Sequence, residues 1–541
     1  MAAVKRSART TPWLSGGRFP RMRRLLLAAV VAAPVACAKV EPARDFQDAR
    51  ERIQSRLEGV ESFDPATEAL VEQKVRAMLD GGLTVDEAVG VALLNNRAFQ
   101  ALFQSIGASR ADVVQSGLLT NPSVGLTARF PEGGGRSNIS FSFAQQIADL
   151  WLIPIRRDVA EARLEETIAN VVRQAVELAA SVRKAYYDLS TIRRREAIAR
   201  ENLQLVRRSI EIAQKRMEGG ESAAIDVNLL RAAEVNVQAT LLTLERDRHV
   251  AKADLARIIG MARWDPSWDI ADTTDPVVRV IPTDQALTIL AMQQRLEARI
   301  AEFNVRAAEG EFRRQQRSVF SSVQLGLEGE RLESRALPGR KIAADTLRSS
   351  IRQGQPTAPD LQSRGERAID RSQIIDMLLG PSIQFTLPVW DQNQAHIAKA
   401  SYQLEASRKT YEDTLDEIAN QVQRAAAVVR ASASLMEFYK STALPTATRN
   451  LELAQGAYKG GEQNVLTVIR AQEFLMTQRQ TAMRIRQDYL AAWVELNRAL
   501  GGKDPPDNVE SAPSPQSSTT GRAAMSTGAS DNPMTDRQTT R

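Results

Sequence analysis

The sequence predicts a mainly α-helical protein with a smaller β component, in which long coiled-coil helices and paired strands occur in two structural repeats. Apolar residues follow a heptad spacing through residues 164–213, which is typical of a long helix in a coiled coil. Residues 124–130 and 139–143 alternate apolar and polar side chains, which is typical of strands with two different faces. The same order of patterns returns in the second half of the chain.

One pair of stretches shows the repeat most directly. Residues 210–214 (IEIAQ) precede residues 219–221 (GGE), and residues 451–455 (LELAQ) precede residues 460–462 (GGE), at the same spacing. A chain that repeats half of its length was built by duplicating one structural unit. The period is too long for a solenoid, so we predict two similar halves arranged around an axis, which suits a pore.

Composition favours long helices over a compact α/β enzyme. The 541-residue chain is 43% hydrophobic but only 5% aromatic, and 71 basic residues are opposed by 65 acidic ones. The charges are mixed along the predicted helices, as on a solvated helix surface. No DNA- or RNA-binding signature accompanies the net charge of +6, so we predict no nucleic-acid partner.

No arrangement of residues typical of catalysis occurs in the sequence. It lacks a phosphate-binding loop, a zinc-protease motif and a serine nucleophile motif. The two histidines, His249 and His396, stand far apart without other metal ligands around them. We therefore predict no enzyme activity, no catalytic residues, no cofactor and no metal site.

The N-terminus has the pattern of an export signal. A basic segment at residues 21–24 (RMRR) precedes an apolar run at residues 25–36, which is too short to cross a bilayer as a helix. Cys37, the single cysteine, follows directly, as in the lipobox of bacterial lipoproteins, and we predict that it is lipidated. Pro34 stands where a lipobox usually has leucine, so a signal peptide with an incidental cysteine is the alternative.

The chain divides into six expected segments. They are a signal peptide (1–36, with Met22 as a possible start), a lipidated N-terminal segment (37–82), a first repeat (83–260), an equatorial linker (261–282), a second repeat (283–501) and a disordered tail (502–541). Residues 38–80 are polar and mixed, and we predict that they are extended or weakly ordered. The tail is rich in Ser, Thr, Pro and Gly.

The first repeat begins with a capping box. Thr84 and Glu87 predict a helix over residues 84–117. The strand hairpin follows, and the heptad pattern then predicts a helix over about residues 157–217, roughly 90 Å long at 1.5 Å per residue. Two glycines end it, and a second helix returns over residues 224–259.

The second repeat follows the same order. We expect a helix at 283–316, strands at 323–328 and 382–387 around a charged insertion at 332–379, a very long helix to residue 459, and a return helix to residue 500. Trp151 and Trp390 occupy equivalent places after a strand in each half. Packing at the junction and a membrane-interface belt both explain them.

The strands bear on how the chain could cross a membrane. No run of about 20 apolar residues remains after Cys37, so we predict no transmembrane helix, and any crossing must be a closed barrel. Four strands cannot close one, because bacterial barrels need at least eight. Several copies must share the barrel: two copies would reach eight strands and three would reach twelve.

Three motifs carry a resemblance to a known family. Residues 115–122 (QSGLLTNP) are similar to its segment entering the first strand, and residues 387–390 (LPVW) resemble its exit from the last strand. Arg216 stands four residues before Gly220, and Asp-Val follows six residues after that glycine, as at the family's helix-hairpin tip. Over about residues 83–500 the chain resembles the TolC family of outer-membrane efflux proteins.

The resemblance implies a homotrimer in the bacterial outer membrane. Its three copies would share a 12-strand transmembrane β-barrel that continues as an α-helical coiled-coil barrel into the periplasm. It implies an exit duct that passes small molecules outward and docks a periplasmic adaptor and an inner-membrane transporter of the RND or ABC type. Lipidated members are common, so palmitate on Cys37 would anchor the chain to outer-membrane lipid.

The resemblance also implies roles for particular residues. The tip turns, with Arg216, Gly219, Gly220, Gly460 and Gly461, would dock the adaptor, although glycine also simply permits φ > 0 at a helix end.

The second tip departs from the motif, because Ala457 stands where Arg is expected and Thr467 where Asp is expected. Asp226, Thr467 and Arg470 would line the periplasmic aperture, and charge rings set ion selectivity in pores. We predict a less acidic aperture than in members with inward-facing carboxylates, with Arg470 pairing with Asp226 or another carboxylate in the closed state.

Two alternatives remain open from the sequence. The same fold serves as the exit duct of a type I protein-secretion system, and only the accompanying transporter distinguishes the two roles. A lipid-anchored structural coiled coil without a pore belongs to another class, and the alternating strands argue against it. The substrate does not follow from the sequence.

Overall fold

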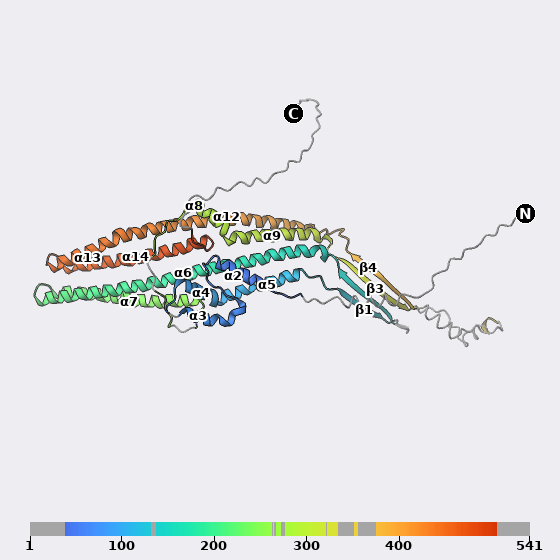
Figure 1. Cartoon of the computed structure of the whole chain (residues 1–541), viewed down its shortest axis with the longest axis horizontal. Helices are drawn as coiled ribbons and strands as arrows, with labels where there is room; N and C mark the ends of the chain where they lie inside the picture. Colours follow the sequence, from blue (N-terminus) through green and yellow to red (C-terminus); the bar gives the residue numbers. More distant parts are fainter. Residues whose placement is uncertain are drawn as a thin grey trace, which may run out of the picture.

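The computed structural model describes residues 38–79, 81–130, 137–261, 263, 267–271, 276–320, 322–333, 351–354 and 375–505. The molecule is elongated, with the ends of two helix hairpins at one extremity and a sheet at the other (Figure 1). Long helices, a small sheet and a duplicated order of elements confirm the predicted mainly α architecture with two repeats.

The helices of the first repeat are α4 (Val85–Asn95), α5 (Arg97–Ser116), α6 (Asp149–Glu218) and α7 (Ala224–Ile258). The capping box is confirmed: the Thr84 hydroxyl accepts from the Glu87 N–H, and the Glu87 carboxylate accepts from the Thr84 N–H. The predicted helix over 84–117 is wrong in one respect, since it breaks at Asn96. That residue is extended (ψ 113°), and its side chain caps α5 by accepting from the Phe99 N–H.

The helices of the second repeat are α8 (Asp284–Gln294), α9 (Leu296–Arg317), the short η2 (Ser318–Phe320), α12 (Gln394–Phe438), α13 (Leu444–Lys459) and α14 (Val465–Ala499). Arg295 breaks the first of them as Asn96 does in the other repeat. The long helix is also interrupted, because Tyr439–Ala443 forms the π-helical turn η3. Pro445 follows at once, and a proline cannot donate to the carbonyl four residues earlier, so the wider turn relieves the clash.

The four strands form one antiparallel sheet in the order β1 (Ser123–Arg129), β2 (Asn138–Gln146), β3 (Val323–Glu333) and β4 (Ile375–Phe385). The strands β2 and β3 pair, so the sheet joins the two repeats. Because β3 and β4 extend into the predicted insertion at 332–379, that insertion is shorter than expected.

The sheet has one apolar face and one polar face. Cross-strand pairs such as Val124 with Phe143, and Leu325 with Ile383, place apolar side chains on one face. The other face carries small and polar residues, among them Ser142 and Ser382. Apolar side chains remain uncovered, since Val124 is 78% exposed.

The segment before the first repeat is folded, contrary to the prediction that residues 38–80 are extended. It forms α2 (Ala43–Gln54), the 3₁₀ turn η1 (Pro65–Leu70) and α3 (Val71–Leu79). Ile53, Leu57 and Phe63 are fully buried in a core shared with α4, α5 and α6. The surface charges of this segment hid an amphipathic pattern whose apolar residues lie on one face.

An arginine of this segment connects distant parts of the chain. One terminal nitrogen of Arg56 donates to the carbonyls of Gln294, at the end of α8, and Gly501, just after α14, both at 2.8 Å. Gly501 adopts φ +86°, and a Cβ there would lie 3.1 Å from the guanidinium. Residues 502–505, placed in the predicted tail, remain attached, since Arg279 donates to Asp504 at 3.2 Å.

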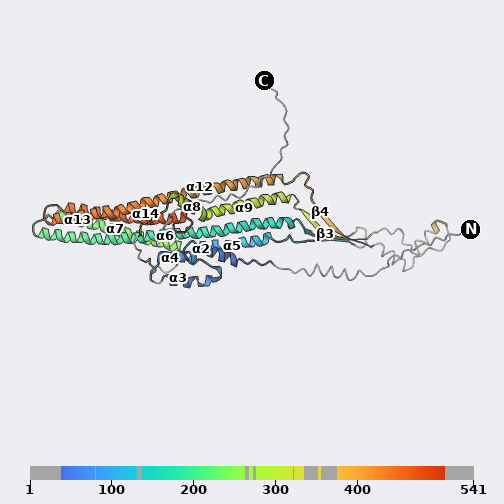
Figure 2. The same ribbon diagram turned by 45° about the horizontal axis from the view of Figure 1, so that its top comes forward.

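In the half of the molecule nearer the sheet, α5, α6, α9 and α12 run side by side in that order (Figure 2). Helix α2 fastens to α5 through Asp45 and Arg110, and to α6 through Arg52 and Glu165. None of the described helices combines the length and the apolar composition that crossing a membrane as a helix requires.

Candidate functional site

The two hairpin turns at the tip have the same geometry. In the first, Gly220 has φ +77°, the Glu221 N–H donates to the Arg216 carbonyl at 2.8 Å, and the Gly220 N–H donates to the Met217 carbonyl. In the second, Gly461 also has φ +77°, and the same two bonds join Glu462 to Ala457 and Gly461 to Tyr458. Both are Schellman caps, which need a left-handed residue after the helix.

An apolar cluster holds the two tips together. It joins α6, α7, α13 and α14 and consists of Val206, Ile210, Ala213, Val227, Leu230, Tyr458, Val465, Val468 and Ile469. One polar contact lies beside it: the buried Gln472 amide donates to the Ser209 hydroxyl at 2.9 Å. The predicted coiled-coil stripe of α6 is therefore buried against the second repeat as well as against α7.

Arg216 bridges the two turns. Its guanidinium carbon lies 4.7 Å from the centroid of the Tyr458 ring, and one of its terminal nitrogens donates to the Tyr458 carbonyl. Its Nε lies 3.6 Å from the carboxylate of Glu221 in its own turn. The sequence singled out Arg216 but missed Tyr458. When the two repeats are aligned, Tyr458 stands where the first repeat has Met217. This difference between the repeats is the feature of the sequence that could have pointed to Tyr458.

Two of the predicted aperture residues, Asp226 and Thr467, lie in the first turns of α7 and α14, and Arg470 lies one turn further along α14. Asp226 accepts a hydrogen bond from the Ser222 hydroxyl at 2.7 Å. Thr467 donates its N–H to the side chain of Asn464, which caps α14. Arg470 is exposed, and in the described part of this single chain no carboxylate lies within ion-pair distance of it. Pairing between Arg470 and Asp226 is thus not present within one chain.

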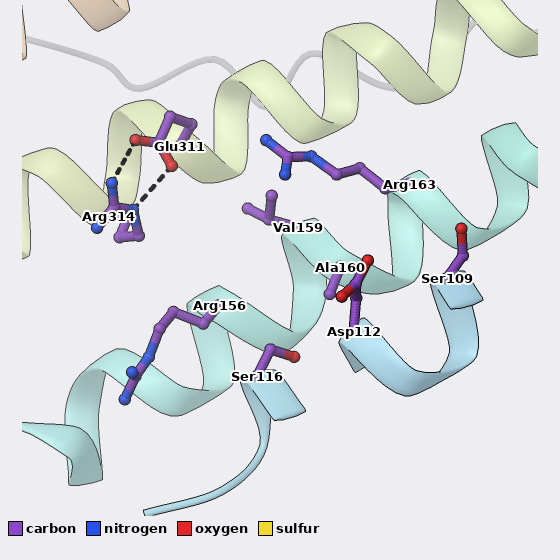
Figure 3. A pocket seen from close by; sticks show the side chains of 9 residues that line it. All are labelled: Ser109, Asp112, Ser116, Arg156, Val159, Ala160, Arg163, Glu311 and Arg314. Carbon is purple, nitrogen blue, oxygen red and sulfur yellow. Dashed lines mark hydrogen bonds and ion pairs between the residues drawn. The ribbon is translucent and has the colours of Figure 1, made fainter. Parts of the chain in front are cut away.

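A second candidate feature is a depression of about 530 Å³ between α5, α6 and α9. Figure 3 shows its charged lining, with Arg163 directed toward α9, where Glu311 and Arg314 form a two-bond ion pair at 2.8 and 2.6 Å. The hydrogen bond from Arg314, together with that from Gln315, lowers the pKa of the Glu311 carboxyl against the opposing effect of burial.

This depression lies on the side of the helices opposite α2. Asp112 in its wall follows the α2 contact Arg110 by two residues, and Arg163 precedes the α2 contact Glu165 by two. Two residues correspond to about 200° around a helix. Helix α2 covers one face of the layer formed by α5 and α6, and the depression lies on the uncovered face.

The junction between sheet and helices is fixed by a buried carboxylate. Asp149, at the start of α6, accepts from the Thr120 N–H at 2.7 Å and forms an ion pair with Arg156. Burial alone would raise the pKa of Asp149, but these bonds outweigh it and lower that pKa below its usual value. They hold the entry to β1 against the first turns of α6.

Both repeats of the chain match a model of a known protein family. The model described as outer membrane efflux protein matches residues 88–261 and 287–502, which is more than half of the chain and covers both repeats. The chain belongs to the outer membrane efflux protein family. The resemblance to TolC channels is thereby confirmed, and with it the assignment to outer-membrane efflux and transport.

Solved structures of outer membrane efflux proteins have the same fold. CusC is 16% identical with a TM-score of 0.60, and the match covers 77% of this chain and 92% of CusC. The Campylobacter jejuni CmeC channel is 14% identical (TM-score 0.59, 78% and 86% covered). The open-state MtrE channel of Neisseria gonorrhoeae is 17% identical (TM-score 0.56, 78% and 90% covered). No curated protein sequence matches the chain significantly.

Outer membrane efflux proteins are channels rather than enzymes, and they form homotrimers that work with adaptors and inner-membrane transporters. Cys37 lies outside the described residues, and so does most of the predicted insertion.

Proposed function

We propose that the chain forms the homotrimeric exit duct of a tripartite efflux pump in the bacterial outer membrane. The sheet is the observation that carries this proposal. Its edge strands β1 and β4 have no partner within the described chain, and its apolar face is uncovered. Free edges and an uncovered apolar face are both costly in water, and edge-to-edge joining of three copies in lipid removes both.

Three copies would form a 12-strand barrel, and α5, α6, α9 and α12 of each copy would continue it as a tube. The face that carries α2 would lie outside, because helices packed on the inner face would fill the tube. The uncovered face with Arg163 and Glu311 would then line the pore.

The position of Cys37 supports a lipid anchor. Pro42 lies against Gly107 in the middle of α5. From Gly107 to the end of α5 is nine residues, or about 14 Å along the helix. The five residues from Cys37 to Pro42 span about 17 Å when extended. The chain can therefore carry Cys37 to the end of α5, on the way to the sheet, and palmitate labelling lost in Cys37→Ala would test the anchor.

At the other end, we propose that the tip turns around Arg216, Gly220 and Gly461 dock a periplasmic adaptor. Asp226, Thr467 and Arg470 would surround the aperture, and Arg470 would pair with a carboxylate of a neighbouring copy when it closes. The loop between β3 and β4 would be extracellular, because it leaves the sheet at the end away from the helices. An epitope there should be accessible on intact cells.

Electron microscopy of detergent-extracted protein tests the duct. We expect class averages of a hollow threefold tube well over 100 Å long, since α6 alone, at 70 residues, spans about 105 Å. A solid or dimeric rod would support the lipid-anchored coiled coil instead. A threefold duct leaves the type I secretion role open, and co-purification with the transporter encoded beside it distinguishes the two.

A further inference from the structure

The last turns of α9, just before the sheet, carry two arginines without a counter-ion among the described residues. Arg313 and Arg317 are four residues apart, both are exposed, and neither forms an ion pair with any described residue. Like charges at this spacing weakly destabilise a helix. Helix-dipole stabilisation explains them only in part, because Arg314 already supplies a cation in the last turn. Lower on the same helix, Arg299 is paired with Glu302 at 2.9 Å.

Arg313 points to the outer side of the layer of helices. It follows Glu311 by two residues and is therefore about 200° around the helix from the carboxylate that lines the uncovered face. Figure 3 shows Glu311 and Arg314 on that uncovered face. The outer face of the adjoining α6 carries Asp158, which forms no ion pair with Arg313 or Arg317. Arg317 follows Glu311 by six residues, or about 240° around the helix, so both arginines lie on the side that also carries α2.

An apolar loop lies at the same end of α9 as these arginines. Residues 387–390 follow β4, and Leu387 and Val389 are exposed, while Trp390 is 90% exposed. Asn393, which adopts φ +63°, holds this loop against the end of α9 by donating to the Gln315 carbonyl and the Ser318 hydroxyl, both at 2.8 Å. Leu387 continues the apolar face of β4, because it follows Ile383 and Phe385 at a spacing of two.

We propose that Arg313, Arg317 and the loop at 387–390 form a collar that binds anionic phospholipids of the periplasmic leaflet. This inference rests on the proposed membrane-inserted duct. The guanidinium groups bind the lipid phosphates, which match their planar donor geometry, and Leu387 and Trp390 enter the boundary between headgroups and acyl chains. Anionic lipid satisfies the uncompensated charge and covers the exposed indole together.

Fluorescence quenching by brominated lipids tests the collar on the full-length protein. In one preparation the protein is placed in phosphatidylcholine nanodiscs that contain a minor fraction of brominated phosphatidylglycerol. In the other, the overall lipid composition is the same, but an equal fraction of the phosphatidylcholine is brominated instead. The contribution of Trp390 is the difference between wild type and Trp390→Phe. We expect phosphatidylglycerol to be enriched about five-fold per arginine around Trp390, so that its brominated form quenches more strongly.

Arg313→Gln combined with Arg317→Gln should make the two brominated lipids equally effective. Arg306→Gln is the matched control, because Arg306 is exposed and unpaired among the described residues, lies on the same face about 10 Å below Arg313, and should leave the preference intact. Should the double variant not assemble, high salt should abolish the preference in the wild type. Equal quenching in the wild type at low salt overturns the collar but not the duct, whereas no quenching by either lipid overturns the membrane insertion itself.

Discussion

Arg216 of the first hairpin lies over the ring of Tyr458 of the second, with 4.7 Å between its guanidinium carbon and the ring centroid. The same guanidinium donates to the Tyr458 carbonyl, whose lone pairs also accept from the Gly461 N–H. One arginine side chain thereby fastens both the ring and the backbone of the opposite turn.

Removing this side chain should separate the two tips. Arg216→Ala deletes a charged hydrogen bond and a cation–π contact, each of which contributes about 1–2 kcal/mol when partly buried. We expect a longer and broader distance distribution between spin labels at Glu218 and Glu462, and a higher conductance in planar bilayers.

Tyr458→Phe is the matched control for that experiment. The Tyr458 hydroxyl is buried and has no hydrogen-bond partner among the described residues, so its loss should leave the ring contact and the tip distance unchanged. If Tyr458→Phe separated the tips as much as Arg216→Ala, the hydroxyl would matter and the role given to Arg216 would be wrong.

The tip glycines should differ in their tolerance of a side chain. At Gly220, alanine would adopt φ +77°, which costs about 1–2 kcal/mol for a residue with a Cβ. Gly219 has φ −79°, so Gly219→Ala is the control and should be neutral or slightly stabilising. Thermal unfolding followed by circular dichroism should show a lower melting temperature for Gly220→Ala than for Gly219→Ala. Equal melting temperatures for the two variants would contradict the need for a left-handed residue at Gly220.

Acid should loosen the junction between sheet and helices. Because the pKa of Asp149 is lowered in the folded chain, its contribution is complete above the unfolded pKa of 3.8 and is lost as pH falls from there through the folded value. Stability should therefore fall in that window. In Asp149→Asn the fall should be shallower, and the variant should be less stable at pH 7. An unchanged acid slope in denaturant titrations would refute this.

The charge of the aperture should control ion selectivity. Arg470 is exposed near the tip and lacks an ion pair within the described chain, so Arg470→Glu reverses an uncompensated charge. We expect the cation-to-anion permeability ratio to rise, as for carboxylate rings in pores. Arg449→Glu, on the neighbouring helix α13, is a useful comparison because Arg449 lies 3.4 Å from Glu452. An unchanged ratio in Arg470→Glu would place Arg470 away from the ion path.

The periodic helices and strands were predictable from the sequence, because the apolar residues on one face of each element set its pattern. The heptad stripe of α6 and the alternation in β1 and β2 are local patterns that burial and pairing reproduce directly. The breaks were not predictable in this way. The spacing of apolar residues continues across Asn96 and across Arg295. Only the extended backbone at these two residues separates the helices on either side.

Long-range contacts account for most of what the sequence did not reveal. Residues 38–80 looked unordered because the partners of Ile53 and Phe63 lie on helices much later in the chain. The pairing of Arg216 with Tyr458 joins residues of different repeats, and no local rule relates them. The glycine turns, in contrast, are predictable from the sequence, because few residues other than glycine adopt the left-handed conformation that follows a helix.

The π-helical turn Tyr439–Ala443 makes the two hairpins mechanically unequal. Helix α6 is continuous over 70 residues. Its counterpart in the second repeat is interrupted between α12 and α13, at a turn that buries none of its side chains. A load applied at the tips bends a rod where its packing is thinnest. We expect the first hairpin to act as the stiff frame and the second as the compliant arm, so that a partner pulling on the tips displaces α13 while α6 stays in place.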